Sequence, residues 1–372
     1  KVLVLKDAKQ NSLKEIKQIE PEIPGKDVAL TIDSRLQYLL YKELEKTGRL
    51  QKARWSTGMI VDVLTGEVLA LSTWPSFNSN NLNEMTGENQ RNRALLDVFE
   101  PGSVMKPFTV AAALDSGKYT TTSLIDTNPG SIRVRGYTIR DHNNLGRITL
   151  GTLLQKSSNV ASTKIALSLP PDAITNMQKQ FGFGSKTPLQ FPGEGSGLVV
   201  TPKEKETSRR ATVSYGYGLQ VTLAQVAQAY SALAAGGVMH PLTLTKDGER
   251  PPSKRIMAHE QAMSIVQMME SVTEPGGTAK GAAIDGYRVA GKTGTSRRIN
   301  PKGGYYTDQY RNVFAGMAPA SNPKLVGVIL IEDPRGQIYA GLTVAPVFHN
   351  VMKEALRLYN VPLDKPLKTE EQ

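Results

Sequence analysis

Ser103 and Lys106 are the two residues of this chain whose types and spacing fit nucleophilic catalysis. They lie in the tetrad Ser103-Val104-Met105-Lys106, between Glu100-Pro101-Gly102 and an apolar run. Residues three apart share a helical face, so we expect the Lys106 amine within reach of the Ser103 oxygen. A serine nucleophile with its base one turn away has this arrangement. The structural alternative is a capped helix start with a solvated lysine.

A second copy of the S-x-x-K pattern, Ser321-Asn322-Pro323-Lys324, shows that the tetrad alone is common. Pro323 disfavours the helical conformation at Asn322, and an extended apolar run follows at 325–331. In the first copy, Pro107 falls in the first helical turn, where its missing N–H has no intrahelical partner to lose. Only the first copy is therefore expected to carry chemistry.

Ser157-Ser158-Asn159 is a second polar cluster, placed between expected helical segments at 150–156 and 160–169. A short break there would let Ser157 and Asn159 project into a cleft. The alternative is a helix–helix turn with capping serines, and two other S-x-N copies occur at 76–78 and 79–81. Only the copy at 157 lies between Ser103 and the third cluster.

The third cluster is Lys292-Thr293-Gly294-Thr295, in a β-prone stretch where alternate residues face the same way. Thr293 and Thr295 would share a face and, with Lys292, could clamp a carboxylate. Gly294 would let a ligand backbone approach the strand. A decoy, Lys46-Thr47-Gly48, is expected at the end of a helix instead.

Residues 286–293 also fit the phosphate-loop pattern G-x-x-x-x-G-K-[ST]. A phosphate loop needs a buried strand before it and a helix after it, because the helix N-terminus faces the phosphates. Residues 277–285 are a poor strand and residues 297–304 are a poor helix. A nucleotide site is therefore not favoured.

Composition narrows the chemistry further. The 372 residues are 39% hydrophobic, which is typical of a globular protein, and the net charge of +11 permits attraction to anionic surfaces. Basic residues are spread out without an aromatic-interleaved stripe, so nucleic acid is not an expected partner. The absence of cysteine excludes thiolate chemistry, and the histidines His142, His240, His259 and His349 show no metal-ligand spacing. Any serine chemistry is expected to use lysine as its base.

The elements around these clusters predict an α+β fold. A helix is expected on Leu36, Leu39, Leu40 and Leu44, with a Ser34…Gln37 capping box and Gly48 as its stop. A hairpin is expected at 58–64 and 67–73, joined at Thr65-Gly66. The region 104–273 should be mostly helical, with periodic segments at 221–235 and 260–272. Strands are expected at 287–295, 312–317, 325–331 and 338–344, before a closing helix at 346–359.

S-x-x-K, S-x-N and K-T-G in this order resemble the motif set of penicillin-binding proteins and serine β-lactamases. The longer strings at 92–103, 214–218 and 291–298 resemble the FtsI-type, division-specific class B penicillin-binding proteins, which are septal peptidoglycan D,D-transpeptidases. The resemblance implies a transpeptidase fold with an antiparallel sheet of about five strands, flanked by helices and joined to a mostly helical subdomain. It places a pedestal remnant at 1–26, the transpeptidase domain at 27–362 and a tail at 363–372.

The resemblance also implies roles for the three clusters. Ser103 would form an acyl-enzyme with a stem peptide, Lys106 would be the base, Ser157 would relay protons and Asn159 would hold the substrate amide. A free lysine has a pKa near ~10.4, so Lys106 must be desolvated or lie near a second cation, for which Lys292 is the candidate.

The remaining implied roles concern binding. Thr293 and Thr295 would bind the substrate carboxylate, Gly294 would be a further substrate-binding residue, and the backbone N–H groups of Ser103 and Thr295 would form the oxyanion hole. Tyr305 and Tyr306, after a flexible Lys302-Gly303-Gly304, could line the cleft wall. No cofactor or metal is implied.

The implied function is D,D-transpeptidation of peptidoglycan stem peptides during cell division, with acylation by β-lactam antibiotics. The parent protein would act at the periplasmic face of the bacterial inner membrane, held by a single N-terminal anchor, beside division proteins such as a septal glycan polymerase. Alternatives are a β-lactamase or D,D-carboxypeptidase of the same fold and a non-catalytic β-lactam sensor or division scaffold. No E-x-x-L-N segment of the class A lactamase type occurs between Asn159 and Lys292.

Overall fold

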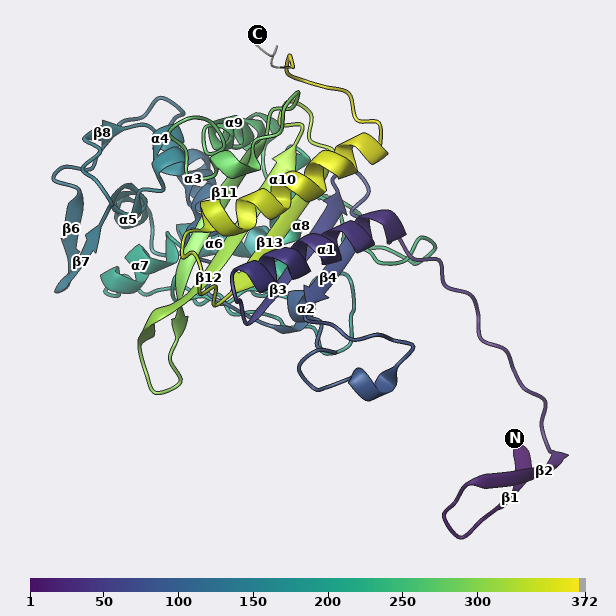
Figure 1. Ribbon diagram of the computed structural model, residues 1–372. Coiled ribbons are helices and arrows are strands. Elements are labelled where there is room, and N and C mark those ends of the chain that lie inside the picture. The colour runs from purple at the N-terminus through teal and green to yellow at the C-terminus, as the bar shows by residue number, and fades with distance from the viewer. Residues whose placement is uncertain (368–372) are drawn as a thin grey trace. The chain divides into compact units, whose positions relative to one another are not determined.

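The computed structural model describes residues 1–367, and its first unit is a hairpin (Figure 1). Contacts separate residues 1–30 from a second unit that begins at Thr31. In the first unit, strands β1 (Val2–Lys6) and β2 (Ser12–Gln18) pair antiparallel. The predicted boundaries at 26/27 and 362/363 stay predictions. Residues 368–372 of the predicted tail lie outside the described residues.

The second unit is built on a five-stranded antiparallel sheet of order β11-β12-β13-β3-β4. Its strands are β3 (Trp55–Asp62), β4 (Val68–Trp74), β11 (Ala290–Ile299), β12 (Tyr305–Ala318) and β13 (Leu325–Glu332). The α+β fold class and the β3–β4 hairpin are thus confirmed. Strands distant in sequence meet because β13 pairs with β3, and this leaves β11 at one edge of the sheet.

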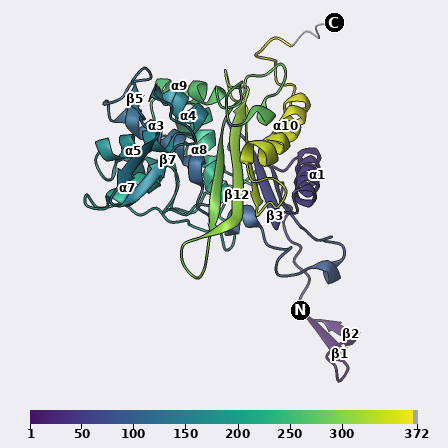
Figure 2. The same cartoon turned by 60° about the vertical axis from the view of Figure 1, so that its left-hand side comes forward.

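Helices cover both faces of this sheet. On one face, α1 (Ser34–Leu50) and α10 (Ala340–Leu358) pack side by side, as Figures 1 and 2 both show. On the other face, α8 (Leu223–Ala234) packs against β3, β12 and β13, and every one of its residues is buried. A helix that is buried all round forms the centre of a domain rather than its surface. It therefore joins the sheet to the helical region.

The helical region lies on the α8 side of the sheet (Figure 2). Its helices are α3 (Lys106–Asp115), α4 (Leu150–Lys156), α5 (Asn159–Ser168), α6 (Ala173–Gln180), α7 (Thr207–Val213) and α9 (His259–Glu270). Phe108 of α3 packs its ring against Phe181, Phe183 and Tyr230 at centroid separations of 4.9, 5.0 and 5.7 Å. The periodic segments predicted at 221–235 and 260–272 are confirmed as α8 and α9.

Short elements complete the unit. They are α2 (Arg93–Leu96), three 3₁₀ helices (Leu82–Glu84, Gly102–Met105 and Lys280–Ala282), and the paired strands β5 (Ile125–Asp126) with β8 (Arg147–Ile148), β6 (Ser131–Val134) with β7 (Tyr137–Arg140), and β9 (Val238–Met239) with β10 (Lys254–Arg255). No helix among residues 1–367 is long and apolar enough to span a membrane.

The strand predicted at 338–344 is wrong, because α10 starts at Ala340 and continues to Leu358. The alternation Ile338-Tyr339-Ala340-Gly341-Leu342 has the period of a strand. Its buried members, however, belong to a helical face that packs on β12 and β13. The predicted closing helix is thus the later part of a longer one, and Pro346 lies inside it.

Both predicted ends of α1 are also wrong. The N-cap is Asp33, whose carboxylate accepts from Arg35 N, while the Gln37 side chain bonds the backbone of Leu71 in β4. Gly48 lies inside the helix, where a Cβ would stand 2.4 Å from the Trp74 ring. Gly48 therefore serves close packing of α1 on β4 and does not end the helix.

Candidate active site

Ser103 lies in the 3₁₀ helix Gly102–Met105, and Lys106 opens α3 directly after it. This turn is held by hydrogen bonds from elements on two sides. Gly102 N donates to Gly216 O at 3.0 Å, and Tyr230 OH of α8 donates to Val104 O at 2.8 Å. A serine is thus fixed between the sheet and the helical region at the start of a buried helix.

Strand β11 approaches the same turn through residues without bulky side chains. A Cβ on Gly294 would stand 2.7 Å from Pro101 O and 3.2 Å from Val104 Cγ1. Gly294 therefore makes room for the backbone that carries Ser103. The sequence analysis predicted that this glycine makes room for a ligand backbone, which would be a second role for the same position. Ser296 Oγ reinforces this contact by donating to Glu100 O at 3.1 Å.

Lys106 is fully buried, and its Nζ donates to oxygens of two residues. Its partners are Ser157 O at 2.5 Å, Ser157 Oγ at 3.0 Å and Asn159 Oδ1 at 2.8 Å. These three contacts hold the amine toward the α4–α5 break, and Ser103 Oγ is not among its hydrogen-bond partners. The predicted clusters around Ser103 and Ser157 therefore meet at Lys106.

Ser157 joins the two buried lysines. It ends α4 in the left-handed conformation, with φ 57° and ψ 45°, which turns both its carbonyl and its hydroxyl toward Lys106. Lys292 of β11 is also fully buried, and its Nζ donates to the same Ser157 Oγ at 3.0 Å and to Thr293 O at 3.1 Å. A single hydroxyl thus bridges the amines of α3 and β11, which is the geometry a proton relay requires.

Asp141, just after β7, holds the α4–α5 break. Its Oδ2 accepts from Ser158 Oγ at 2.6 Å, and its Oδ1 accepts from Asn159 N at 2.6 Å and Val160 N at 3.1 Å. A carboxylate at a helix N-terminus satisfies backbone donors and favours the helix dipole. Asp141 therefore fixes the start of α5, from which Asn159 reaches Lys106.

Burial changes the protonation of both lysines. Desolvation lowers the pKa of Lys106 well below its usual value, the positive charge of Lys292 lowers it further, and Asp141 opposes the change. Burial lowers the pKa of Lys292 to about 7. An amine that loses its proton this readily can act as a base near neutral pH.

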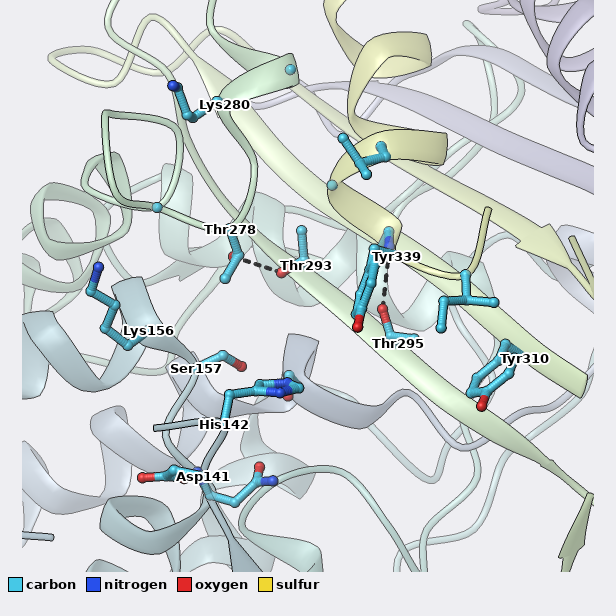
Figure 3. Close-up of a pocket in the computed structure, with 18 of the residues that line it drawn as sticks. Asp141, His142, Lys156, Ser157, Thr278, Lys280, Thr293, Thr295, Tyr310 and Tyr339 are labelled. Carbon is cyan, nitrogen blue, oxygen red and sulfur yellow. Dashed lines mark hydrogen bonds between the residues drawn. The ribbon is translucent and has the colours of Figure 1, made fainter. Parts of the chain in front are cut away.

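A cavity of about 880 Å³ opens over these groups (Figure 3). Its lining brings together Ser103, Ser157, Asn159, Thr293 and Thr295, which come from the three predicted clusters. Figure 3 shows Thr293 and Thr295 on β11, across the cavity from Ser157. The residues that the sequence separates by almost two hundred positions thus share one site.

The polar groups of β11 point into this cavity or toward its rim. Thr293 Oγ1 lies 2.8 Å from Thr278 Oγ1, and Thr295 Oγ1 accepts from Ala340 N at 3.3 Å (Figure 3). Thr295 O lies 3.8 Å from where a Cβ on Gly102 would stand, and in a strand the N–H points to the same side as the C=O. The Thr295 N–H therefore faces the turn that carries Ser103.

Tyr305 and Tyr306 do not line this cavity, in contrast to the cleft-wall prediction. The Tyr305 ring packs 5.7 Å from the Tyr217 ring, and Tyr306 lies under the Arg298 guanidinium. Tyr310 and Tyr339 line the cavity instead (Figure 3). Both predicted tyrosines precede the part of β12 that reaches the site, so proximity to the flexible loop was a misleading signal.

The second S-x-x-K copy and the phosphate-loop pattern do not form sites of their own. Ser321 bonds the Asp364 carboxylate at 2.6 Å and precedes β13, and Lys292-Thr293 continues into a strand rather than a helix. The phosphate-loop context is therefore absent from residues 277–304. No three His, Asp or Glu side chains gather as metal ligands anywhere in residues 1–367.

Several lining residues were not predicted as site residues from the sequence, among them Asp141, Thr278 and Tyr310. The polar run Asp141-His142-Asn143-Asn144 after a short strand was a usable signal of a loop with a function. Thr278 carried no local signal, since only the fold brings its loop beside β11. Such residues are found from tertiary contacts rather than from patterns.

Comparisons with known proteins agree with this geometry. A family model described as the penicillin binding protein transpeptidase domain matches residues 56–353. The peptidoglycan D,D-transpeptidase FtsI of Escherichia coli K12 is 42% identical over 91% of this chain and 57% of that protein. The probable peptidoglycan D,D-transpeptidase PenA of Neisseria flavescens is 36% identical over 98% of this chain and 91% of that protein. The apo transpeptidase (TP) domain of Burkholderia pseudomallei penicillin-binding protein 3 superposes with a TM-score of 0.82 and 39% identity, covering 92% of this chain and 100% of that domain.

The antiparallel sheet, the helical region and the polar cavity that joins the three motifs define a domain of the penicillin-binding kind. The chain belongs to the penicillin-binding protein transpeptidase domain family. The resemblance to FtsI-type proteins and the expected transpeptidase fold are thereby confirmed. The chain spans 57% of the length of the E. coli relative.

Proposed function

We propose that this protein is a serine D,D-transpeptidase that cross-links peptidoglycan stem peptides and that β-lactams acylate at Ser103. The observation that carries the proposal is the hydroxyl of Ser157, which bridges two fully buried lysines at 3.0 Å each beside a cavity lined by Ser103. Names of relatives at 42% and 36% identity support the same activity.

In the proposed acylation step, Ser103 Oγ attacks the carbonyl between the two terminal D-alanines of a stem peptide. The Ser103 proton passes to Lys106, whose burial favours the neutral amine. The peptide C–N bond then breaks as the leaving amine takes a proton through Ser157, which contacts both lysines. An acyl-enzyme on Ser103 and free D-alanine result.

Charge that develops on the carbonyl oxygen would be stabilised by the Ser103 and Thr295 N–H groups. Ser103 lies in the first turn of a 3₁₀ helix, where N–H groups lack intrahelical acceptors, and the Thr295 N–H faces the same turn. One such donor contributes about 3 to 4 kcal/mol in comparable enzymes. Thr293, Thr295 and Lys292 would hold the terminal carboxylate, and Asn159 the substrate amide.

In the second step, an amine of a neighbouring stem peptide attacks the acyl carbon, and the C–O bond to Ser103 breaks. A β-lactamase or carboxypeptidase would need a base that activates water here. Asp141 is the carboxylate that lines the cavity, and its oxygens already accept three hydrogen bonds. This engagement favours amine transfer over fast hydrolysis.

The broader setting is proposed from the family resemblance. The parent protein would act in cell division at the periplasmic face of the inner membrane, with a septal glycan polymerase as partner. The net charge of +11 suits an anionic cell-wall polymer. Neither a metal nor a cofactor takes part in the proposed steps.

Incubation with a labelled penicillin, followed by intact mass, tests the proposal. A stable adduct that Ser103→Ala abolishes is expected, and the matched variant Ser321→Ala should keep the adduct. Rapid turnover of the penicillin would identify a lactamase. Adduct formation without transfer of a D-alanyl donor to any amine would identify a sensor or scaffold, and no adduct at Ser103 would overturn the proposal.

A further inference from the structure

Beyond the catalytic groups, the charged residues that line the active-site cavity are mainly cations. Its charged lining residues are Arg140, Asp141, Lys156 and Lys280. Asp141 is engaged by Ser158 and the start of α5, so the open charges are positive. This rim is distinct from Lys106 and Lys292, which are buried beneath it.

Lys156 and Lys280 lie at one end of the cavity. Figure 3 shows both on the same side as Thr278, with Tyr310 at the opposite end. Lys156 precedes Ser157 in the chain and donates to Gly276 O at 2.8 Å, while Lys280 follows Thr278 by two positions. Neither lysine forms an ion pair within residues 1–367. Two exposed ammonium groups therefore remain available to a ligand.

The loop that carries this end is anchored. Thr278 Oγ1 contacts Thr293 Oγ1 at 2.8 Å, and Thr273 Oγ1 donates to Val289 O at 2.8 Å. A Cβ on Gly341 of α10 would stand 2.0 Å from Thr278 O. The loop backbone is thus packed between β11 and α10, which fixes the segment that carries Lys280 and the Gly276 carbonyl that Lys156 contacts.

Reaction geometry assigns this end to one of the two substrates. In the first step the amine of D-alanine leaves on the side where Thr293 and Thr295 hold its carboxylate. The acceptor amine must attack the same carbonyl from the side that the leaving amine has vacated, because the acyl chain occupies the other. The acceptor therefore enters past Thr293 and meets Thr278, Lys156 and Lys280.

We propose that the cavity end formed by Lys156, Thr278 and Lys280 is the acyl-acceptor subsite, and that it selects amines carrying a second, remote carboxylate. The inference rests on the proposed transpeptidase function. In the step it governs, the acceptor nitrogen bonds to the acyl carbon, the bond to Ser103 Oγ breaks, and the amine proton returns to Ser103 by way of Ser157 and Lys106. Hydrogen bonds between charged groups make such selection effective.

The test uses an N-acyl-D-alanyl thioester donor with D-glutamate and D-glutamine as acceptors, which differ only in the remote carboxylate. Wild type should prefer D-glutamate. The double variant Lys156→Gln with Lys280→Gln should reduce that preference by about tenfold, as expected for loss of a charge-assisted hydrogen bond. Lys280→Glu should favour D-glutamine. Added salt should weaken the wild-type preference, since the lysines are exposed.

Lys118→Gln is the matched control, because Lys118 is also exposed and donates to a backbone carbonyl, Ser168 O, at 2.9 Å. Penicillin adduct formation at Ser103 should stay within twofold in every lysine variant. The subsite would be overturned if the lysine variants kept the wild-type acceptor preference. It would also be overturned if they changed the KM for the thioester donor equally with both acceptors. Loss of the wild-type adduct or of all transfer would overturn the proposed function instead.

Discussion

Strand β11 carries two clusters of buried charge with opposite designs. At Lys292 the ammonium is fully buried and, within residues 1–367, bonds only a hydroxyl and a carbonyl oxygen. At Arg298, on the same strand, the guanidinium pairs at 2.7 Å with Glu332, which Arg311 also contacts at 2.5 Å. The first cluster leaves positive charge uncompensated, and the second neutralises it. Removing one partner of a compensated pair destabilises a fold, whereas uncompensated charge changes pKa values and so suits chemistry.

The largest expected effect comes from removing the uncompensated amine of α3. Lys106→Met should slow penicillin acylation by about 10² to 10⁴-fold, the usual contribution of a general base. The free energy of unfolding should be unchanged or higher, because a buried amine that is costly to desolvate is replaced by an apolar side chain of similar length. Acylation kinetics and denaturant titration measure the two effects, with Lys118→Met as control. A destabilised variant would contradict the contrast between the clusters.

Breaking the compensated cluster should have the reverse outcome. Glu332→Gln leaves Arg298 and Arg311 without their shared carboxylate, so the free energy of unfolding should fall by about 3 kcal/mol. Without denaturant, the rate of penicillin acylation of this variant should stay within about threefold of the wild-type rate. Glu354→Gln, which breaks an exposed pair with Arg357, is the control and should change stability by less than about 1 kcal/mol. Equal stability of the two variants would argue against a structural role for Glu332.

The pH dependence of stability should report Lys292 directly. Its pKa is about 7 in the folded protein and higher when unfolded, so between these values the unfolded chain binds more protons. The free energy of unfolding should therefore rise with pH above about 7, by up to about 1.4 kcal/mol per pH unit from this group. Lys292→Met should remove that contribution. Parallel curves for wild type and variant would show that Lys292 titrates normally.

The smallest effect is expected at Asp141, which supports the site without reacting. Asp141→Asn keeps the shape but loses the charge at the start of α5, so stability should fall by about 1 kcal/mol. We expect about tenfold slower acylation, since Asn159 and Ser157 lose their fixed positions. A change in kcat with little change in KM would indicate positioning. Asp126→Asn is the control, because that carboxylate only organises its own exposed turn.

Much of the fold followed from local pattern. The β3–β4 hairpin, α8, α9 and the strands of the C-terminal half were predictable because each has a regular period and clear stops. The segment 338–344 was not, since a few alternating residues fit a strand and a helix end equally well. The role of Gly48 was misjudged for a different reason: a glycine shows that space is needed, and only the tertiary contact shows for what.

Some residues of the candidate site were likewise predictable from the sequence, and others were not. Ser103, Ser157, Asn159, Thr293 and Thr295 were predictable because each stands in a motif with an order along the chain, and the structure brings them to one cavity. Asp141 and Thr278 act through contacts between distant loops, which leave no periodic trace. Tyr305 and Tyr306 were chosen by nearness in sequence to a flexible loop, yet the residues of β12 that reach the cavity begin further along.

The backbone of Ser157 adopts a conformation that glycine would adopt more easily. Its left-handed backbone is strained for a residue with a side chain, and glycine would relieve the strain. Glycine would also keep the carbonyl that receives Lys106 while deleting the hydroxyl that bridges to Lys292. The backbone conformation of residue 157 thus favours glycine, whereas the proposed proton transfer requires the serine hydroxyl. A Ser157→Gly protein is therefore a natural separation-of-function variant, in which scaffold and proton transfer can be studied apart.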